Sequence, residues 1–546
     1  MMPTVAGEVA RGLEQAGASH VFGLIGEGNM VLANALTDEA GLTFIGARHE
    51  SAAIGMADGY ARATGSVGVA TVTQGPGVTN TLTALITAQN ARSPIVLFAP
   101  EVPADVLWHI QKLDLQSLCD GAGMACVELD LSAPDRTVAE CHDWAAKNRR
   151  PIVVRFPFPD LEALVPESET ARPTALPPTP QIAAELPNDA GMQEAVTLLG
   201  ESERPVILVG HGVRLSGAEQ EVAKLAEATG AIIATTLFGK GILADHPHSV
   251  GLCGGFSQPW TRDLIHDSDL VLVLGASLNQ FTTHQGTILP KGGPLIHCDA
   301  EASHIGRITD VDVALVGDAK ATAAELTRRF LASNEARRSE RLTDQDAGPS
   351  PGRRPARENV LDPELLMQQL NALLPPDRVV VIEGGHNMGF CARNLDARGS
   401  RSFFVPIEFG AIGSALGVGI GASFGQPESL PVITIGDGSL LMSFGELETL
   451  CRYEVPCVLI VLDDGSYAAE YHALDLKRMN LQHSVYPHRD FAAVARSLGA
   501  AAYTLRAPED LATLPQISRA TLDGPLVLDC KIDLLIRGDW LDPAGQ

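Results

Sequence analysis

The feature that most constrains the fold is a repeated alternation of short apolar runs with helical patterns. Continuous apolar runs separated by helices are typical of strands in parallel sheets that are covered on both faces. Three such groups in series predict an α/β protein of three doubly wound domains with mainly parallel sheets. The runs are HVFGLIG, LTFIGA, VGVATVT and PIVLFAP, then PVILVG, GAIIATT, LVLVLG and PLIHCD, then RVVVIEG, PVITIGDG, PCVLIVLDD and PLVLDCKI.

Two segments rich in Pro, charged and small polar residues interrupt this alternation. They cover residues 166–187 and 333–359, and neither has an apolar period, so we expect exposed linkers there. The expected domains are therefore residues 1–165, 188–332 and 360–546. In doubly wound sheets ligands bind beyond the carboxyl ends of the strands, which is where functional motifs are expected.

Charge and cysteine usage exclude several classes of protein. The chain of 546 residues has a formal net charge of −26, so neither a nucleic acid nor an anionic membrane is an expected partner. The glycine-rich apolar segment 405–424 contains Glu408, and we expect a buried loop and helix rather than a membrane span. Nine cysteines without a CxxC motif and an N-terminus without signal-peptide features predict a reduced cytoplasmic protein.

Acidic residues follow two of the predicted strands in the last domain. GDGS, Gly436–Ser439, comes directly after PVITI, and Asp463 and Asp464 end the run VLIVLDD. Carboxylates at neighbouring strand ends, together with loop carbonyls, form the hard oxygen site that Mg²⁺ prefers, commonly with phosphate oxygens. Two separate turn caps are the alternative interpretation of the same residues.

The order of the motifs resembles the thiamine diphosphate-dependent enzymes of the acetolactate synthase and pyruvate decarboxylase family. GDGS followed about 25 residues later by LDDGSY resembles the family signature GDG(S/A)…NN. ARHESAAIGMADGYAR (47–62), TQGPGVTNTLTAL (73–85) and FGAIGSALGVGIGA (409–422) resemble its other conserved segments, and RPVILVGHGV resembles its central domain. The resemblance covers almost the whole chain and implies two cofactors, thiamine diphosphate and Mg²⁺.

The resemblance also implies roles for individual residues. Glu50 corresponds to the glutamate that hydrogen-bonds the aminopyrimidine ring, so that the 4′-nitrogen can take the thiazolium C2 proton. The backbone of Gly410 accepts from the 4′-amino group, and Ile412 supports the bent cofactor. The implied Mg²⁺ ligands are the side chains of Asp437 and Asp464 and the carbonyl of Ser466. Further implied cofactor contacts are Gly438, Ser439, Asn80, Gly385 and His386.

One position departs from the family pattern, because Asp463-Asp464 stands where relatives have Asn-Asn. The ligating side chain at 464 is then an anion beside an anionic diphosphate. We expect this change to tighten metal binding and to penalise a diphosphate bound without metal. Asp463 is expected to cap the turn.

Two further acids are candidates for proton transfer to and from the substrate. Glu27, in FGLIGEGN, and Glu470, six residues after Asp464, occupy positions where decarboxylases of the family carry acids near the reacting carbon. Exposed polar residues on loops are the alternative interpretation. Other candidates for substrate contact are His109 and Gln111 in VLWHIQKLD, Gln74 before GPG, and more weakly Asn29 and His472.

The predicted function is cleavage or formation of a C–C bond next to a carbonyl, as 2-oxo acid decarboxylation or carboligation of a ketone or aldehyde. The alternatives are a lyase or hydrolase of an α-hydroxy ketone, a 1,2-diketone or a 2-hydroxyacyl-CoA, and a cofactor-binding homologue without turnover. The tail LIRGDWLDPAGQ lacks a basic cluster, which disfavours CoA substrates.

Two other expectations concern the central domain and assembly. The segment SLNQFTTHQG after LVLGA lacks the arginines expected for FAD, so FAD stays a less favoured alternative. GHGVRLSG has the wrong spacing for a nicotinamide dinucleotide. The family resemblance implies a homodimer or homotetramer whose active sites lie between subunits.

Overall fold

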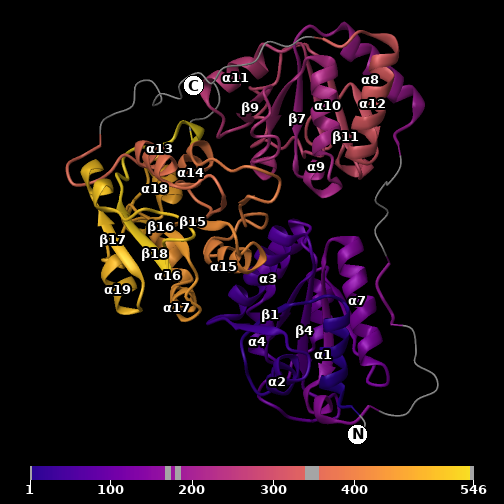
Figure 1. Cartoon of the computed structure of the whole chain (residues 1–546), viewed down its shortest axis with the longest axis vertical. Coiled ribbons are helices and arrows are strands. Elements are labelled where there is room, and N and C mark those ends of the chain that lie inside the picture. The colour runs from indigo at the N-terminus through magenta and orange to yellow at the C-terminus, as the bar shows by residue number, and fades with distance from the viewer. Residues whose placement is uncertain (1–2, 166–173, 179–185, 338–355, 542–546) are drawn as a thin grey trace. The chain divides into compact units, whose positions relative to one another are not determined.

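The computed structural model describes residues 3–165, 174–178, 186–337 and 356–541 (Figure 1). It contains three six-stranded sheets, and the strand pairs of the first and central sheets are parallel throughout. This confirms the predicted α/β fold of three doubly wound sheets. The predicted linkers lie largely outside the described residues.

The first sheet has the strand order β2-β1-β3-β4-β6-β5. Its strands are β1 (His20–Gly23), β2 (Thr43–Gly46), β3 (Gly68–Thr71), β4 (Ile95–Glu101), β5 (Ala125–Glu128) and β6 (Pro151–Pro157). Its helices are α1 (Val5–Gln15), α2 (Met30–Asp38), α3 (Glu50–Thr64), α4 (Pro76–Thr79), α5 (Leu82–Asn90), α6 (Leu115–Gly121) and α7 (Pro134–Asn148). The four strands expected from sequence are present, and β5 and β6 are additional.

The central sheet has the strand order β12-β11-β10-β7-β8-β9. Its strands are β7 (Pro205–Val209), β8 (Ile232–Thr235), β9 (Ser249–Leu252), β10 (Leu270–Leu274), β11 (Leu295–Asp299) and β12 (Val313–Val316). Its helices are α8 (Asp189–Glu201), α9 (His211–Ser216), α10 (Glu219–Thr229), α11 (Pro259–His266) and α12 (Ala319–Ser333).

The third sheet has the strand order β14-β13-β15-β16-β18-β17. Its strands are β13 (Arg378–Ile382), β14 (Phe403–Phe404), β15 (Leu430–Gly436), β16 (Cys457–Asp463), β17 (Ala501–Leu505) and β18 (Pro525–Lys531). The helices are α13 (Pro363–Leu373), α14 (Met388–Asn394), α15 (Ala415–Gly425), α16 (Asp437–Met442), α17 (Gly445–Arg452), α18 (Ala468–Leu476) and α19 (Phe491–Ser497). Strands β15, β16 and β18 are parallel neighbours, so Asp437, Asp464 and Lys531 all stand at one edge of this sheet.

The chain forms two compact units. The first unit comprises residues 1–180, 379–385 and 404–532, and the second comprises residues 181–378, 386–403 and 533–546. The first sheet and most of the third sheet therefore belong to one unit, whose apolar core contains buried residues from both. The central sheet belongs to the other.

Helices α3 and α15 pack directly against each other in the first unit (Figure 1). A Cβ at Gly59 would lie 2.0 Å from the Val418 carbonyl oxygen, and a Cβ at Gly421 would lie 1.8 Å from that of Met56. Only glycine allows two helix backbones to approach this closely. Gly417 and Gly421 of segment 405–424 thus serve a helix–helix contact.

The charged residue in that apolar segment is also accounted for. The Glu408 carboxylate is paired with the buried Arg62 guanidinium at 2.7 Å, and Arg62 is paired with Asp58 on the same helix at 2.8 Å. In the part of the chain that the structure describes, no helix is both long enough and apolar enough to cross a membrane.

Candidate active site

The predicted metal ligands lie together at the carboxyl edge of the third sheet. Asp437 begins α16 directly after β15, and Asp464 follows β16, which is the neighbouring strand. Both side chains are buried. The Gly465 N–H donates to Asp437 Oδ2 at 3.1 Å, and the Ser466 hydroxyl donates to Asp464 Oδ1 at 2.8 Å. The two acidic motifs therefore form one cluster rather than two unrelated caps.

Tyr486 completes this cluster, although the sequence analysis did not identify it. Its hydroxyl lies 2.9 Å from the Ser466 carbonyl oxygen and 3.3 Å from Asp437 Oδ1. The segment that carries Tyr486 pairs with the loop that follows β16, because Ser466 and Val485 form an antiparallel bridge. A Cβ at Gly438 would lie 2.5 Å from the Tyr486 hydroxyl, so this position requires glycine. One side chain thus contacts two of the predicted ligands.

The electrostatics of the cluster favour a bound cation. Burial and the neighbouring carboxylates of Asp464 and Asp463 raise the pKa of Asp437 far above the ordinary carboxyl range. A divalent ion would relieve this repulsion, and hard carboxylate and carbonyl oxygens suit Mg²⁺. No group of three or more His, Cys, Asp or Glu suitable for a metal occurs among the described residues. The two carboxylates and one carbonyl would therefore need further oxygen ligands, which a diphosphate and water can supply.

Asp463 caps the turn as predicted and has an additional partner. Its Oδ1 accepts from the Gly465 N–H at 3.1 Å and contacts His488 Nδ1 at 2.6 Å. Its Oδ2 accepts from the buried Lys531 ammonium at 2.5 Å. The first residue of the Asp-Asp pair is thus turned toward an internal cation, whereas Asp464 is turned toward the ligand cluster.

Glu50 and Asn80 are brought together in the first domain. Glu50 is the first residue of α3 and is 9% exposed. Its Oε2 accepts a hydrogen bond from Asn80 Nδ2 at 3.0 Å, and Gly77 lies beside its Oε1. A neutral amide therefore orients the carboxylate of Glu50.

The packing of α3 on α15 brings the segment 410–412 to the same end as Glu50. The close approaches run in parallel, from Ala52 with Gly417 to Tyr60 with Gly425, so the amino termini of both helices lie together. Gly410 has φ = 78° and would have no atom within 4 Å of an added Cβ, while Ile412 lies against Gly384. Glu50 and the segment 410–412 of one chain therefore lie at the same end of the helix pair.

Glu383 holds the glycine-rich loop in place and was not identified from sequence. Its Oε2 accepts from the N–H groups of Gly413 and Ala415 at 2.9 and 3.1 Å. Burial raises the pKa of this carboxyl group. Gly385, two residues later, has φ = 103°, which favours glycine.

Two further predicted cofactor contacts, Ser439 and His386, belong to different units of the structure. Ser439 is buried in the first turn of α16, beside Asp437. His386 belongs to the second unit, where its Nε2 accepts from the Gly538 N–H at 3.0 Å and its ring lies 5.8 Å from that of Trp540. A cofactor contact of His386 stays a prediction.

Hydrogen bonds of the buried Asn29 side chain fix the loop that carries Glu27. Asn29 is fully buried, accepts from the Gly26 N–H at 2.8 Å and donates to the Leu24 carbonyl at 3.2 Å. These hydrogen bonds hold the loop, and a substrate contact of Asn29 stays a prediction. Glu27 itself is exposed, and the neighbouring Gly28 N–H donates to the Thr73 hydroxyl at 3.2 Å.

Gln74 and Gln111 form a linked pair beside this loop. Gln74 Nε2 donates to Gln111 Oε1 at 2.8 Å, and the Gln111 N–H donates to His109 Nδ1 at 3.1 Å. The structure thus places three of the predicted substrate contacts next to one another. Glu470 is exposed in the first turn of α18 and His472 is buried on the same helix. No described hydrogen bond joins Glu470 to Glu27 or Glu50.

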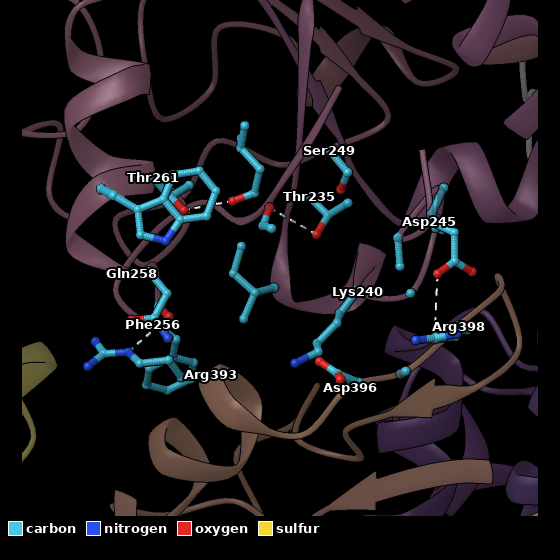
Figure 2. Close-up of a pocket in the computed structure, with 18 residues that line it drawn as sticks. Thr235, Lys240, Asp245, Ser249, Phe256, Gln258, Thr261, Arg393, Asp396 and Arg398 are labelled. Carbon is cyan, nitrogen blue, oxygen red and sulfur yellow. Dashed lines mark hydrogen bonds and ion pairs between the residues drawn. The ribbon is translucent and has the colours of Figure 1, made fainter. Parts of the chain in front are cut away.

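A separate cavity of about 310 Å³ lies in the second unit (Figure 2). None of the predicted site residues lines it. Its cationic side chains already have partners: Lys240 donates to the Ala392 carbonyl, Arg398 lies 3.5 Å from Asp245, and Arg393 contacts the Phe256 carbonyl at 3.4 Å. FAD in the central domain stays an open alternative that this cavity does not support.

Comparison with known proteins gives three matching family models that follow one another along the chain. They are the N-terminal TPP binding domain (residues 3–122), the central domain (192–326) and the C-terminal TPP binding domain (383–530) of thiamine pyrophosphate enzymes. Their order follows that of the three sheets, although the N-terminal match ends before β5 and β6 and the C-terminal match begins after β13.

Relatives with assigned names cover nearly the whole chain. A probable acetolactate synthase large subunit of Methanocaldococcus jannaschii is 28% identical over 98% of this chain and 93% of its own length. A sulfoacetaldehyde acetyltransferase of Castellaniella defragrans is 29% identical over 91% of this chain and 87% of its own.

A solved structure shares the fold at 23% identity. It is a thiamine diphosphate-dependent 4-hydroxybenzoylformate decarboxylase of Rhodococcus jostii RHA1, with a TM-score of 0.80 over 97% of this chain and 99% of that chain. With the family models and the clustered motif residues, these similarities assign the protein to a family. The chain belongs to the thiamine diphosphate-dependent enzymes of the acetolactate synthase and pyruvate decarboxylase family.

Proposed function

We propose that this protein uses thiamine diphosphate and Mg²⁺ to cleave or form a C–C bond next to a carbonyl, as a 2-oxo acid decarboxylase, a carboligase or both. The observation that carries the proposal is the placement of Glu50. Glu50 is buried at the start of α3 and oriented by Asn80 at 3.0 Å, and the chain also carries the buried pair Asp437 and Asp464 for the metal.

The chain's own residues would bind the cofactor and move one proton. When bound, the cofactor supplies a thiazolium carbon that becomes a nucleophile after losing its proton. The Gly410 carbonyl would accept from the amino group, and Ile412 would support the ring contact. Glu50, oriented by Asn80 at 3.0 Å, would exchange a proton with the pyrimidine ring.

The metal site would fix the opposite end of the cofactor. Asp437, Asp464 and the Ser466 carbonyl offer three hard oxygens to Mg²⁺ at adjacent strand ends. Glu27 and Glu470 are proposed to handle protons at the substrate, and Gln74, Gln111 and His109 to contact its polar groups. Intact Glu50, Asp437 and Asp464 argue against a homologue that only binds cofactor.

A substrate panel tests the proposed reaction. We expect purified protein with added thiamine diphosphate and Mg²⁺ to consume at least one 2-oxo acid, alone or with an aldehyde as acceptor, with products identified by mass spectrometry. The panel includes α-hydroxy ketones, 1,2-diketones and a 2-hydroxyacyl-CoA. Turnover of one of these without any 2-oxo acid turnover would replace the proposal with the lyase or hydrolase alternative.

We also propose that the enzyme is a homo-oligomer whose subunits meet near the active site. Large apolar side chains are exposed beside the proposed site segments, including Trp108 at 81% next to His109 and Phe409 at 51% next to Gly410. Others in the same unit are Ile25, Met30, Leu107, Ile110, Leu441, Met442, Leu476, Met479 and Val485. A second copy would remove this surface from water.

Mixing two inactive variants tests whether the site lies between subunits. If Glu50 serves the Asp437 cluster of another subunit, co-expressed Glu50→Gln and Asp437→Ala chains form mixed dimers with one intact site. We then expect activity in about a quarter of all sites for a random mixture. Activity no higher than that of either variant alone would instead mean that one chain supplies both residues.

A further inference from the structure

Lys531 is a buried lysine next to the proposed metal site that no motif predicted. It is the last residue of β18, and its side chain is 2% exposed. Its ammonium contacts Asp463 Oδ2 at 2.5 Å and Asp529 Oδ1 at 2.8 Å, and it donates to the Arg489 carbonyl. A lysine is rarely buried this fully unless charged partners surround it.

The strand ends around Lys531 carry an excess of negative charge. Asp437, Asp463, Asp464 and Asp529 are each 5% exposed or less and stand on or directly after the neighbouring strands β15, β16 and β18. His488, which contacts Asp463, is 47% exposed at its side chain. One divalent ion carries two charges against four buried carboxyl groups, and Lys531 supplies a further positive charge next to two of them.

The hydrogen bonds divide the carboxylates into two groups. Asp463 and Asp529 contact Lys531, while Asp437 and Asp464 bond to the loop with the Ser466 carbonyl. The Asp463 side chain also interacts with that of Asp437, so the two groups adjoin. One N–H couples the groups, because Gly465 donates to Asp437 Oδ2 and to Asp463 Oδ1, both at 3.1 Å. The position of Asp463 therefore sets the position of a proposed metal ligand.

We propose that Lys531 is a positioning residue for the metal site: it holds Asp463 away from the metal and so reserves the divalent ion for Asp437, Asp464 and the diphosphate. Lys531 thereby makes an acidic residue tolerable at position 463, where the signature that this motif resembles has an uncharged Asn. This inference rests on the proposed use of thiamine diphosphate and Mg²⁺, but not on any particular substrate.

The experiment is a cycle of Lys531→Met, Asp463→Asn and the double variant. Each protein is first freed of metal and then supplied with Mg²⁺ at several concentrations. Thiamine diphosphate is titrated into each sample, and its affinity is measured by calorimetry. We expect Lys531→Met to weaken cofactor binding by about 10- to 100-fold, as is typical for residues that orient metal ligands. Asp463→Asn alone should bind within about threefold of wild type, and it should restore most of the affinity in the double variant.

A matched control separates positioning from general destabilisation. Lys240, a half-buried lysine of the second unit, donates to the Ala392 carbonyl. Lys240→Met should lower the melting temperature without changing affinity for the cofactor or Mg²⁺. If Lys531→Met does not fold, Lys531→Arg and the double variant Lys531→Met/Asp463→Asn are measured instead. Both are expected to bind thiamine diphosphate within about tenfold of the wild-type affinity.

Three results would overturn the inference: unchanged cofactor affinity in Lys531→Met, no rescue by Asp463→Asn, or a loss of affinity in Asp463→Asn as large as in Lys531→Met. Failure of the wild type to bind thiamine diphosphate with Mg²⁺ would instead overturn the proposed function. Binding without turnover of any tested substrate would leave the Lys531 result valid.

Discussion

Glu50→Gln is expected to lower turnover of a responsive substrate by about 10²- to 10⁴-fold, the usual contribution of a positioned acid–base group. Glutamine has the same length and keeps an oxygen for the hydrogen bond from Asn80, which is 3.0 Å in the wild type. It cannot exchange a proton with the pyrimidine ring. Affinity for thiamine diphosphate should therefore change far less than kcat, and steady-state kinetics with calorimetry separate the two.

Glu446→Gln is the matched control for this variant. Glu446 is also buried, and its Oε1 accepts from the backbone N–H groups of Arg48 and His49, directly before Glu50. Its replacement alters the entry to α3 without removing the proposed acid–base group. A similar loss of kcat in both variants would show that the effect of Glu50 arises from local structure, and undiminished turnover in Glu50→Gln would refute the proposed role.

Asp437→Ala is expected to abolish metal-dependent cofactor binding, with a loss of affinity at least as large as the roughly 10- to 100-fold typical for residues that only orient ligands. Without metal, the same substitution should instead raise the thermal stability of the protein. Burial and the neighbouring carboxylates raise the pKa of Asp437, so the folded state loses stability as pH rises through that pKa. The variant should melt at a higher temperature than wild type in EDTA at neutral pH.

The contrast between the two conditions is the diagnostic result. Wild-type protein should gain stability when Mg²⁺ and thiamine diphosphate are added, whereas Asp437→Ala should gain none. Asp318→Asn serves as the control, because this Asp caps α12 through the Ala321 N–H at 3.0 Å, far along the chain from the cluster. A full ligand-induced shift in Asp437→Ala would contradict the assignment of this residue to the metal.

Sequence patterns predicted most of the strands with apolar runs, although β12 (VALV) was missed. Runs such as PVITI and VLIVL became β15 and β16, and the acids that follow them meet at one sheet edge. Strands with charged or partly exposed residues were missed. β6 includes Arg155, which pairs with Glu101 and Glu128 of neighbouring strands, and only one of the four residues of β5 is buried. Their pairing comes from tertiary contacts that no local period reveals.

The candidate site was predictable where a residue lies within a motif. Glu50, Asn80, Asp437, Asp464 and Ser466 were all found in this way, and the structure places the first two together and the last three together.

The residues that support the motifs were not predictable. Tyr486 lies 20 residues beyond Ser466, and Lys531 ends a strand that reads as ordinary core. Their importance depends on strand order and on loop pairing. Asn29 shows the converse, because a polar residue beside a motif proved to be a buried loop support.

The most direct test of the central claim needs no substrate. In deuterium oxide, exchange of the thiazolium C2 proton can be followed by acid quenching and NMR of the released cofactor. Protein with Mg²⁺ should accelerate this exchange over free thiamine diphosphate by about 10²-fold or more, and Glu50→Gln should lose most of that acceleration. Exchange at the rate of the free cofactor in the wild-type protein, despite demonstrated binding, would contradict the account.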